Sequence, residues 1–519
     1  MVILNQITDY LTVTTFQSSI KNQIILLILK PYSAIIMKKS IKSIALCTTL
    51  FFLTITTFAQ DKAKEIEQLL SKYNEYGQFN GSALVAENGK VIFKKGFGSA
   101  NFEWNIPNQS DTKFRLGSIT KQFTALLIVK LAEEGKIKLD VPITTYLPDY
   151  PKENGDKITI HHLLTHSSGI PNYTNAPNFF KDKARNPYAP AEFVKTFSTL
   201  PLDFAPGEKF NYSNSGYFLL GYIIEKITGK TYEQYLQETI FTPLKMVNSG
   251  YDHSDLIIKN RAAGYEKEGK KIVNAAYIDM SIPYAAGSLY STVEDLYLWD
   301  QALYTNKLLS EKSMELIFKP YVKAGDDSYG YGWGIEEVSI GNRAKVKITE
   351  HGGGINGFNT IISRIPADKN LVVLLNNTGG TVLGEMNEAI RAILYKQSYN
   401  QPKKSLALDL LDAYSLKGVS GGNEAYKKLK NDPTYAIKEG DMNRIGYQLL
   451  QTGKKKEAIE VFKINVEAFP KSGNTYDSLG EAYLADGDKK LAIENYTKSV
   501  ELDPSNEGGK KVLAELSKK

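Results

Sequence analysis

The sequence is poor in the residues that form disulfides and thiolate metal sites. Its 519 residues include one cysteine, Cys47, which lies in an apolar stretch near the N-terminus. The rest of the chain therefore has no disulfide framework, cysteine nucleophile or thiolate ligand. Excess charge is also scarce, because the formal net charge is only +6. Residues 1–59 hold five lysines and one aspartate and so contribute +4, which leaves +2 for residues 60–519. That balance gives no support for nucleic acid as a partner.

No extreme of composition is present either. Hydrophobic residues make up 42% of the chain, aromatic residues 11% and charged residues 23%, which is close to the average for globular proteins. This composition excludes wholesale disorder, a collagen-like fold and a polytopic membrane protein. At roughly 150 residues per domain the length allows about three domains.

Residues 37–59 have the pattern of a secretory signal peptide. A basic start, Met37-Lys-Lys, is followed by an apolar and Thr-rich run that ends in small residues at Ala59. The run is short for a membrane span of about 20 residues, so we expect cleavage after Ala59 and no stable membrane span in the mature chain. Residues 1–36 are interpreted as an upstream extension. The expected location is exported, either periplasmic or extracellular.

The C-terminal part contains a repeat with a period of 34 residues. Gly446, Ala458, Phe462 and Pro470 recur as Gly480, Ala492, Tyr496 and Pro504. This pattern resembles tetratricopeptide repeats, in which small residues let antiparallel helices approach closely. We expect an all-α repeat domain at 438–519, preceded by a linker or degenerate repeat at 398–437. The repeats serve either to bind a protein partner or as a packing appendage.

Residues 61–397 mix strand-like and helix-like stretches, which predicts an α+β fold. Gly81–Lys94 reads as a hairpin around an Asn88-Gly89 turn. Apolar periodicity predicts helices at 118–134, at 217–227 ended by Gly229, and at 384–395. Antiparallel strands are expected at 331–338, 344–349, 358–364 and 371–376.

Ser118 and Lys121 stand at the start of the long apolar helix expected at 118–134. A spacing of three residues places both side chains on one helix face, so the lysine can reach the hydroxyl. The N-terminus of a helix also favours the negative charge that develops when a serine attacks a carbonyl. The pair is therefore a candidate nucleophile and proton acceptor, although Ser-x-x-Lys alone is a weak signal.

Two further motifs carry candidate site residues. Tyr212 and Asn214 lie on a polar loop before the helix at 217–227. A phenol near a lysine amine can exchange a proton with a serine, and we expect nearby positive charge to lower the pKa of Tyr212. His351 precedes a run of glycines that includes Gly353 and Gly354, where a substrate backbone can approach a strand edge.

These three motifs, in this order, resemble the serine β-lactamase and penicillin-binding-protein superfamily, in the branch of class C β-lactamases, D-alanyl-D-alanine carboxypeptidases and related esterases. The resemblance covers nearly all of 64–395 and includes the stretches 114–124, 161–171, 206–217 and 286–296. It implies a β-lactamase-like fold, an antiparallel sheet flanked by helices plus a helical subdomain, with no cofactor or metal.

The resemblance also implies a role for each candidate residue. Ser118 would be the acylated nucleophile, Lys121 and Tyr212 the proton-transfer pair, and Asn214 the residue that orients the substrate. The backbone N–H groups of Ser118 and of the glycine strand, at Gly353 and Gly354, would form the oxyanion hole. Which of the proton-transfer pair is the acylation base stays open.

One departure from the family pattern is informative. His351 stands where the relatives usually carry the lysine of Lys-Thr-Gly. A neutral histidine offers less positive charge to bind a β-lactam carboxylate. We therefore expect hydrolysis of small esters or of D-amino-acid peptides and amides. The alternatives are a β-lactamase or D,D-carboxypeptidase, and an inactive hydrolase fold that binds partners through its repeats.

His162 and His166 have the i, i+4 spacing of a zinc helix. No glutamate follows the first histidine and no third ligand is apparent in the sequence. We expect these side chains to cap and pack a short helix instead.

Overall fold

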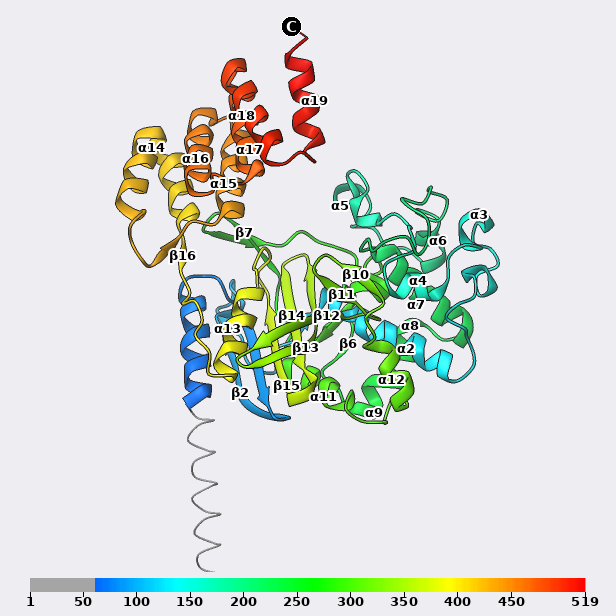
Figure 1. Ribbon diagram of the computed structural model, residues 1–519. Coiled ribbons are helices and arrows are strands. Elements are labelled where there is room, and N and C mark those ends of the chain that lie inside the picture. The colour runs from blue at the N-terminus through cyan, green and yellow to red at the C-terminus, as the bar shows by residue number, and fades with distance from the viewer. Residues whose placement is uncertain (1–60, 519) are drawn as a thin grey trace, which may run out of the picture. The chain divides into compact units, whose positions relative to one another are not determined.

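The computed structural model describes residues 61–518 (Figure 1). The extension expected at 1–36 and the signal peptide expected at 37–59 lie outside the described residues, as does Cys47. Across 61–518, no helix combines the length and the apolar character that a membrane span requires.

An eight-stranded antiparallel sheet forms the centre of the N-terminal region, residues 61–397, in the order β10-β11-β12-β13-β14-β15-β1-β2. The bounds are β1 Gly81–Glu87, β2 Lys90–Phe97, β10 Val322–Ala324, β11 Asp327–Tyr329, β12 Gly334–Ile340, β13 Arg343–Ile355, β14 Phe358–Ile365 and β15 Asn370–Asn376. The predicted hairpin joins β1 to β2. Asn88 and Gly89 both have positive φ there, as its two-residue turn requires.

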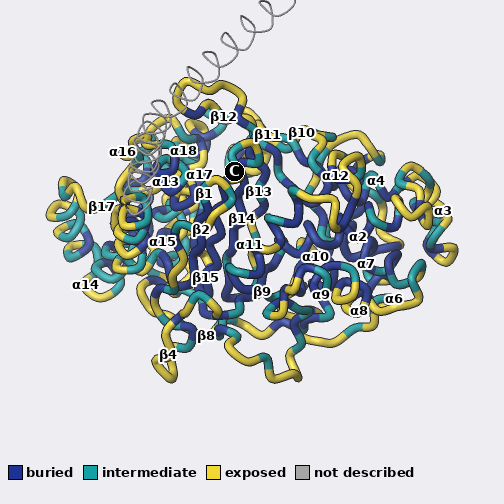
Figure 2. Tube along the Cα trace, turned by 90° about the horizontal axis from the view of Figure 1, so that it is seen from below, coloured by how far each residue is buried: buried dark blue, intermediate teal, exposed yellow. Residues whose placement is uncertain are grey.

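Inside this open sheet, the strand that comes first in the chain, β1, pairs with the one that comes last, β15. Gly81 of β1 lies opposite Asn376 of β15. Six of the seven residues of β1 and all of β15 are buried, so these strands read as apolar runs and not as alternating patterns. Figure 2 shows this burial along the central strands and along the helices beside them.

Helices flank the sheet. The first helix of the N-terminal region spans 61–75, and the others come from its middle and its end. Their bounds are α2 Thr120–Glu133, α3 Lys152–Gly155, α4 Ile160–Leu164, α5 Phe179–Asp182, α6 Pro190–Val194, α7 Asn214–Thr228, α8 Tyr232–Leu236, α9 Thr242–Leu244, α10 Tyr284–Gly287, α11 Val293–Ala302, α12 Glu311–Ile317 and α13 Gly384–Leu394. Gly229 ends α7 in the left-handed conformation, as predicted. The arrangement confirms the α+β class.

Short strands form three smaller sheets. A three-stranded sheet has the order β5-β9-β6, and two hairpins pair β3 with β4 and β7 with β8. The bounds are β3 Ser99–Asn101, β4 Ile106–Pro107, β5 Phe114–Arg115, β6 Gly250–Tyr251, β7 Tyr265–Glu268, β8 Lys271–Asn274 and β9 Leu289–Ser291. The β5-β9-β6 sheet matters most for the site, because β5 leads directly into the candidate nucleophile.

The C-terminal region is helical, as the repeat predicts. Its helices are α14 Leu406–Leu429, α15 Glu439–Gln451, α16 Lys455–Ala468, α17 Gly473–Asp486, α18 Lys489–Leu502 and α19 Glu507–Leu516, and a short parallel pair joins β16 Lys404–Ser405 to β17 Tyr435–Ala436. A Cβ on Gly446 would lie 2.5 Å from the Phe462 ring, and one on Gly480 would lie 3.1 Å from Tyr496. Small residues therefore permit the close helix contacts.

The segment at 398–437 is mainly one helix with a break. Gly418 has φ 64° and ψ −165° inside α14, which no helical residue adopts. Whether this segment is a linker or a degenerate repeat stays a prediction.

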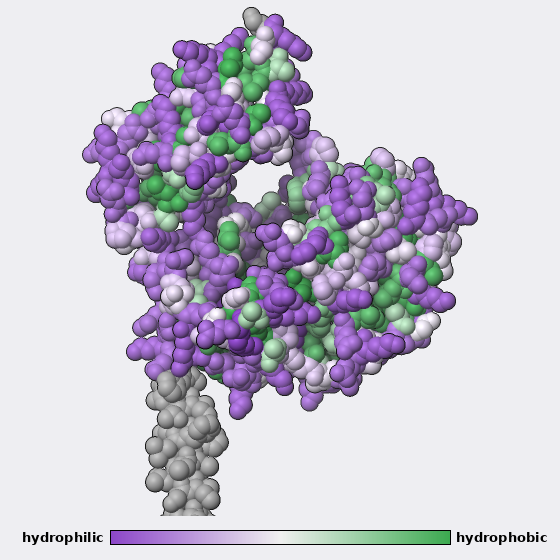
Figure 3. Space-filling model, viewed as in Figure 1, coloured by the Kyte–Doolittle hydropathy of each residue, from purple (hydrophilic) through white to green (hydrophobic). Residues whose placement is uncertain are grey.

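On the face drawn in Figure 3, hydrophilic residues dominate the surface and apolar residues appear in small groups.

Candidate active site

Ser118 lies in a tight turn at the mouth of α2. The α-helix itself begins at Thr120, two residues later than expected, and Ser118 belongs to a 3₁₀ turn over Gly117–Ile119. Gly117 has φ +55°, and a Cβ there would lie 2.8 Å from the backbone nitrogen of Gly354. Only glycine meets both demands, so the turn brings the serine beside the glycine strand.

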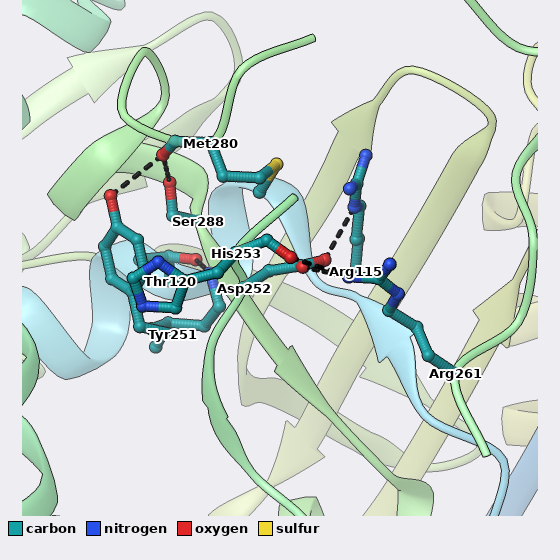
Figure 4. Close-up of polar contacts among 9 residues, drawn as sticks. Arg115, Thr120, Tyr251, Asp252, His253, Arg261, Met280 and Ser288 are labelled. Atoms are coloured by element: carbon teal, nitrogen blue, oxygen red, sulfur yellow. Dashed lines mark hydrogen bonds and ion pairs between the residues drawn. The ribbon is translucent and has the colours of Figure 1, made fainter. Parts of the chain in front are cut away.

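A network of buried polar contacts fixes the strand before this turn (Figure 4). The carboxylate of Asp252 is fully buried and accepts a hydrogen bond of 2.6 Å from Arg115 Nε. Arg261 also pairs with this carboxylate. A buried carboxylate requires such partners to offset its lost hydration. Asp252 therefore anchors β5, which delivers Ser118.

The same sheet holds the first turn of α2. The backbone N–H of Leu116 donates to the carbonyl of Leu289, and the N–H of Leu289 donates to Thr120 Oγ1. Ser288 and Tyr251 both donate to the carbonyl of Met280, as Figure 4 shows. Hydrogen bonds thus hold the chain both before Ser118, at Leu116, and after it, at Thr120.

Lys121 is fully buried and makes three hydrogen bonds. Its Nζ lies 3.0 Å from Ser118 Oγ, 2.8 Å from Asn214 Oδ1 and 2.8 Å from the carbonyl oxygen of Ala286. No carboxylate is among these partners. Burial accordingly lowers the pKa of Lys121 well below that of an ordinary lysine. Proton acceptance from the serine is the chemistry that this environment favours.

The turn at α10, which supplies the Ala286 carbonyl, was not among the sequence-based site predictions. Tyr284 adopts φ +40°, an uncommon conformation for a residue with a side chain. The carbonyl of Ala285 accepts from Thr124 Oγ1 and that of Ala286 accepts from Lys121. The stretch 286–296 was part of the family resemblance, but a backbone carbonyl has no residue type that would reveal its role.

Tyr212 is packed by His166 from the segment that follows α4. The two rings lie 4.2 Å apart, and Lys121 Nζ lies 4.8 Å from the centre of the Tyr212 ring. His166 holds the loop through its backbone and its ring: its carbonyl accepts from Asn211 N, and its Nδ1 accepts from Ser213 N at 3.1 Å. His166 therefore positions Tyr212.

The expected direction of the Tyr212 pKa is wrong. Burial raises the pKa of Tyr212, and a hydrogen bond with Ser118 only partly offsets that increase. The prediction assumed that positive charge on the neighbouring lysine dominates, whereas burial is the largest influence on the pKa of the phenol. The phenol is thus neutral at ordinary pH.

His162 caps α4, as expected for a structural histidine. Its backbone N–H donates to Thr159 Oγ1, and its Nδ1 accepts from the N–H of Thr159. With His166 occupied at the Tyr212 loop, the two histidines serve different backbone segments and do not face a shared ligand.

His351 is 8% exposed and sits on β13 with its ring near Tyr212. Its Nε2 lies 2.9 Å from the hydroxyl of Tyr329, a partner that the sequence did not reveal. Burial is the main cause that lowers the pKa of His351, to about 4. Glu350 points elsewhere and accepts from Asn387, which agrees with the expected alternation of a strand.

The glycine strand forms part of a free edge. Strand β12, which pairs with one edge of β13, begins at Gly334, opposite Glu350. The residues of β13 after Glu350, through Gly354, therefore have no β12 partner on that edge. A Cβ on Gly353 would lie 1.9 Å from the Leu116 carbonyl oxygen. Gly353 therefore lets the strand pack against the backbone that leads to Ser118, whereas a Cβ on Gly354 would only come into ordinary contact with Asn359 Nδ2, at 3.7 Å.

Ser118, Asn214 and Gly354 line one cavity of about 310 Å³. Lys121 is buried beside Ser118 and Asn214, and His351 and Gly353 lie on the neighbouring strand. The structure thus brings the predicted site residues together. The other lining residues are Gly117, Tyr173, Thr174, Phe179, Phe180, Glu266, Ile278, Ile282, Pro283, Ala286, Gly287, Ile355, Asn356, Phe358, Asn359, Gly379 and Gly380.

Comparisons with known proteins agree with this geometry. The sequence profile described as Beta-lactamase matches residues 66–395, and a tetratricopeptide-repeat profile matches 473–506. PbpX of Bacillus subtilis, described as a penicillin-binding protein, is 33% identical over 339 residues, which are 65% of this chain and 81% of PbpX.

Two solved structures show the same fold. A penicillin-binding protein from Bacillus halodurans is 30% identical, with a TM-score of 0.56, and the match covers 63% of this chain and 98% of that one. A D-stereospecific amidohydrolase from a Streptomyces species is 25% identical, with a TM-score of 0.53, covering 64% of this chain and 97% of the other.

Proposed function

Because the chain belongs to the beta-lactamase family, we propose that it is an exported serine hydrolase that forms an acyl-enzyme on Ser118. Its substrates are small esters or peptides and amides of D-amino acids. The observation that carries this proposal is the set of three contacts made by the buried Lys121 amine with Ser118, Asn214 and Ala286.

Those contacts support Lys121 as the acylation base. A neutral amine has two N–H donors and one lone pair. Asn214 Oδ1 and the Ala286 carbonyl are acceptors only, so they take the two donors. The lone pair then faces Ser118 Oγ, whose hydroxyl can donate its proton to Lys121 as the oxygen attacks the substrate carbonyl.

The surrounding groups supply the rest of the reaction. The backbone N–H groups of Ser118 and Gly354 are the oxyanion donors, since both residues border the cavity. Asn214 uses Oδ1 for the lysine, which leaves its Nδ2 to bind the substrate. Tyr212, a neutral phenol against Ser118, donates its own proton to the leaving group. When water hydrolyses the acyl-enzyme, the phenolate takes a proton from the water and protonated Lys121 returns its proton to Ser118 Oγ, so all three side chains regain their starting state.

The neutral state of His351 supports esters and D-amino-acid amides over β-lactams. With its pKa near 4, His351 carries no charge to attract the carboxylate of a β-lactam or of a peptide C-terminus. The likeness to a D-stereospecific amidohydrolase points to the same substrate class. Export rests on the pattern at 37–59, and N-terminal sequencing of the mature protein tests it.

Intact-protein mass spectrometry tests the reaction. The protein is incubated with a fluorophosphonate, chromogenic esters, D-alanyl peptides and β-lactams. We expect a covalent adduct and ester turnover in the parent protein and neither in Ser118→Ala. Ser110→Ala is the matched control, because Ser110 belongs to another Ser-x-x-Lys copy, with Lys113, outside the cavity. Adducts in Ser118→Ala, or no reaction with any reagent, would overturn the proposal.

A further inference from the structure

The cavity beside Ser118 contains one charged side chain among its lining residues, and that side chain is Glu266. The other polar groups of the lining are hydroxyls and amides, from Ser118, Tyr173, Thr174, Asn214, Asn356 and Asn359. The reaction proposed above gives Glu266 no role. A carboxylate in a substrate cavity nevertheless influences which ligands enter.

Glu266 is held in place by backbone. It lies on β7, and its Oε1 accepts a hydrogen bond of 2.8 Å from the N–H of Gly357, at the turn between β13 and β14. A Cβ on Gly379 would lie 1.9 Å from Glu266 Oε2. The carboxylate therefore lies against the backbone of Gly379, and the Gly357 N–H fixes one of its oxygens.

The charge of Glu266 is not neutralised by a side chain. Within residues 61–518, no lysine, arginine or histidine forms an ion pair with it. The adjacent Lys267 donates instead to Thr381 Oγ1. The side chain of Glu266 is only partly buried, so a ligand in the cavity can reach its carboxylate.

Glu266 also lies within reach of a small substrate bound at Ser118. Gly354 packs against Gly117, which precedes the nucleophile, and Gly357 binds Glu266. Gly357 follows Gly354 by three positions, so their Cα atoms lie at most about 11 Å apart. A group held within about this distance of the scissile carbonyl by a chain of several bonds can therefore meet the carboxylate, since Ser118 and Glu266 line the same cavity.

We propose that Glu266 makes this hydrolase select substrates that carry an ammonium group and reject substrates that carry a carboxylate. The inference rests on the proposed reaction at Ser118 and names its substrate class. An ammonium group forms a charge-assisted hydrogen bond with Glu266. A substrate carboxylate instead meets like charge, with no cationic lining residue to compensate.

Matched substrates test this selection. We suggest p-nitroanilides whose acyl chain ends in an ammonium, a methyl or a carboxylate group, each at the lengths of 3-aminopropanoyl and 6-aminohexanoyl. We expect kcat/KM to fall in the order ammonium, methyl, carboxylate for at least one length. In Glu266→Gln, the ratio of kcat/KM for ammonium over methyl should fall by about tenfold to a hundredfold, the worth of a charged hydrogen bond.

Glu268→Gln is the control, because Glu268 is an exposed acid of the same strand that does not line the cavity. It should keep the parent ratio. Equal kcat/KM for the ammonium and methyl substrates, or an unchanged ratio in Glu266→Gln, would overturn the inference while Ser118-dependent turnover stands. No turnover of any substrate, or turnover that survives in Ser118→Ala, would instead overturn the proposed reaction on which it rests.

Discussion

The hydrolase region and the repeats bury different kinds of group. At the candidate active site, Lys121 is fully buried and bonds to residues 93 and 165 positions away in the sequence. In the repeats, glycines pack against aromatic rings of the next helix, as Gly446 does against Phe462. Burial of the Lys121 amine removes its hydration, which is unfavourable but makes the amine a better proton acceptor. The glycine–aromatic contacts of the repeats instead stabilise the fold through close packing.

The largest expected effect comes from removing the buried amine. Lys121→Met should lower kcat/KM for ester hydrolysis by about 10²- to 10⁴-fold, because Ser118 loses its proton acceptor. Ester kinetics and acylation followed by mass spectrometry measure the loss. Lys113→Met is the control, since Lys113 lies outside the cavity. An active Lys121→Met protein would show that the buried polar cluster does not make this region reactive.

The second largest effect is on the stability of the hydrolase region. Asp252→Ala leaves Arg115 and Arg261 without their shared partner, and we expect a loss of about 3–5 kcal/mol in the free energy of unfolding. Urea denaturation followed by circular dichroism measures it. Asp255→Ala, a nearby change of the same type, should have little effect. A small loss in Asp252→Ala would mean that the anchor of β5 is redundant.

A smaller loss is expected in the repeats. Gly446→Ala places a Cβ 2.5 Å from the Phe462 ring, and overpacking of this kind costs about 1–3 kcal/mol. Thermal unfolding should show the loss, while kcat/KM per folded molecule stays unchanged. Gly440→Ala is the control, because a Cβ there meets nothing within 4 Å. A change in kcat/KM with Gly446→Ala would contradict the expectation that packing in the repeats does not affect the active site.

The smallest effect concerns the orientation of His351. Tyr329→Phe removes the hydroxyl that contacts Nε2 and should lower kcat by about tenfold or less, with a net hydrogen bond worth about 1 kcal/mol. Because the hydroxyl no longer hydrogen-bonds Nε2 of the neutral imidazole, that nitrogen accepts a proton more easily, and the pKa of His351 should rise from about 4. Nuclear magnetic resonance titration of the imidazole detects that rise, which a purely structural defect would not produce.

The repeats and the hairpin of β1 and β2 were predictable because their determinants are local. The 34-residue spacing, the Asn88-Gly89 turn and the Gly229 cap each act through neighbours in the sequence. The candidate catalytic residues were predictable in type, since Ser118 and Lys121 share one helical turn.

Other features of the site could not be predicted because they depend on tertiary contacts. The Ala286 carbonyl, the Tyr329 hydroxyl and the Glu266 carboxylate reach the site from distant segments. The direction of the Tyr212 pKa was mistaken because burial, which raises it, depends on the whole fold. The pKa values at this site therefore depend on tertiary packing, which a short sequence motif does not specify.

The pH dependence of Ser118 acylation tests the central claim, that a neutral Lys121 is the base. The amine accepts a proton only when unprotonated, so acylation should be slow in acid and rise with pH. Because burial lowers the pKa of Lys121, the account predicts that this rise ends well below the ordinary lysine pKa of about 10.4. A rise centred at or above that value, or a profile unchanged in Lys121→Met, would contradict the account.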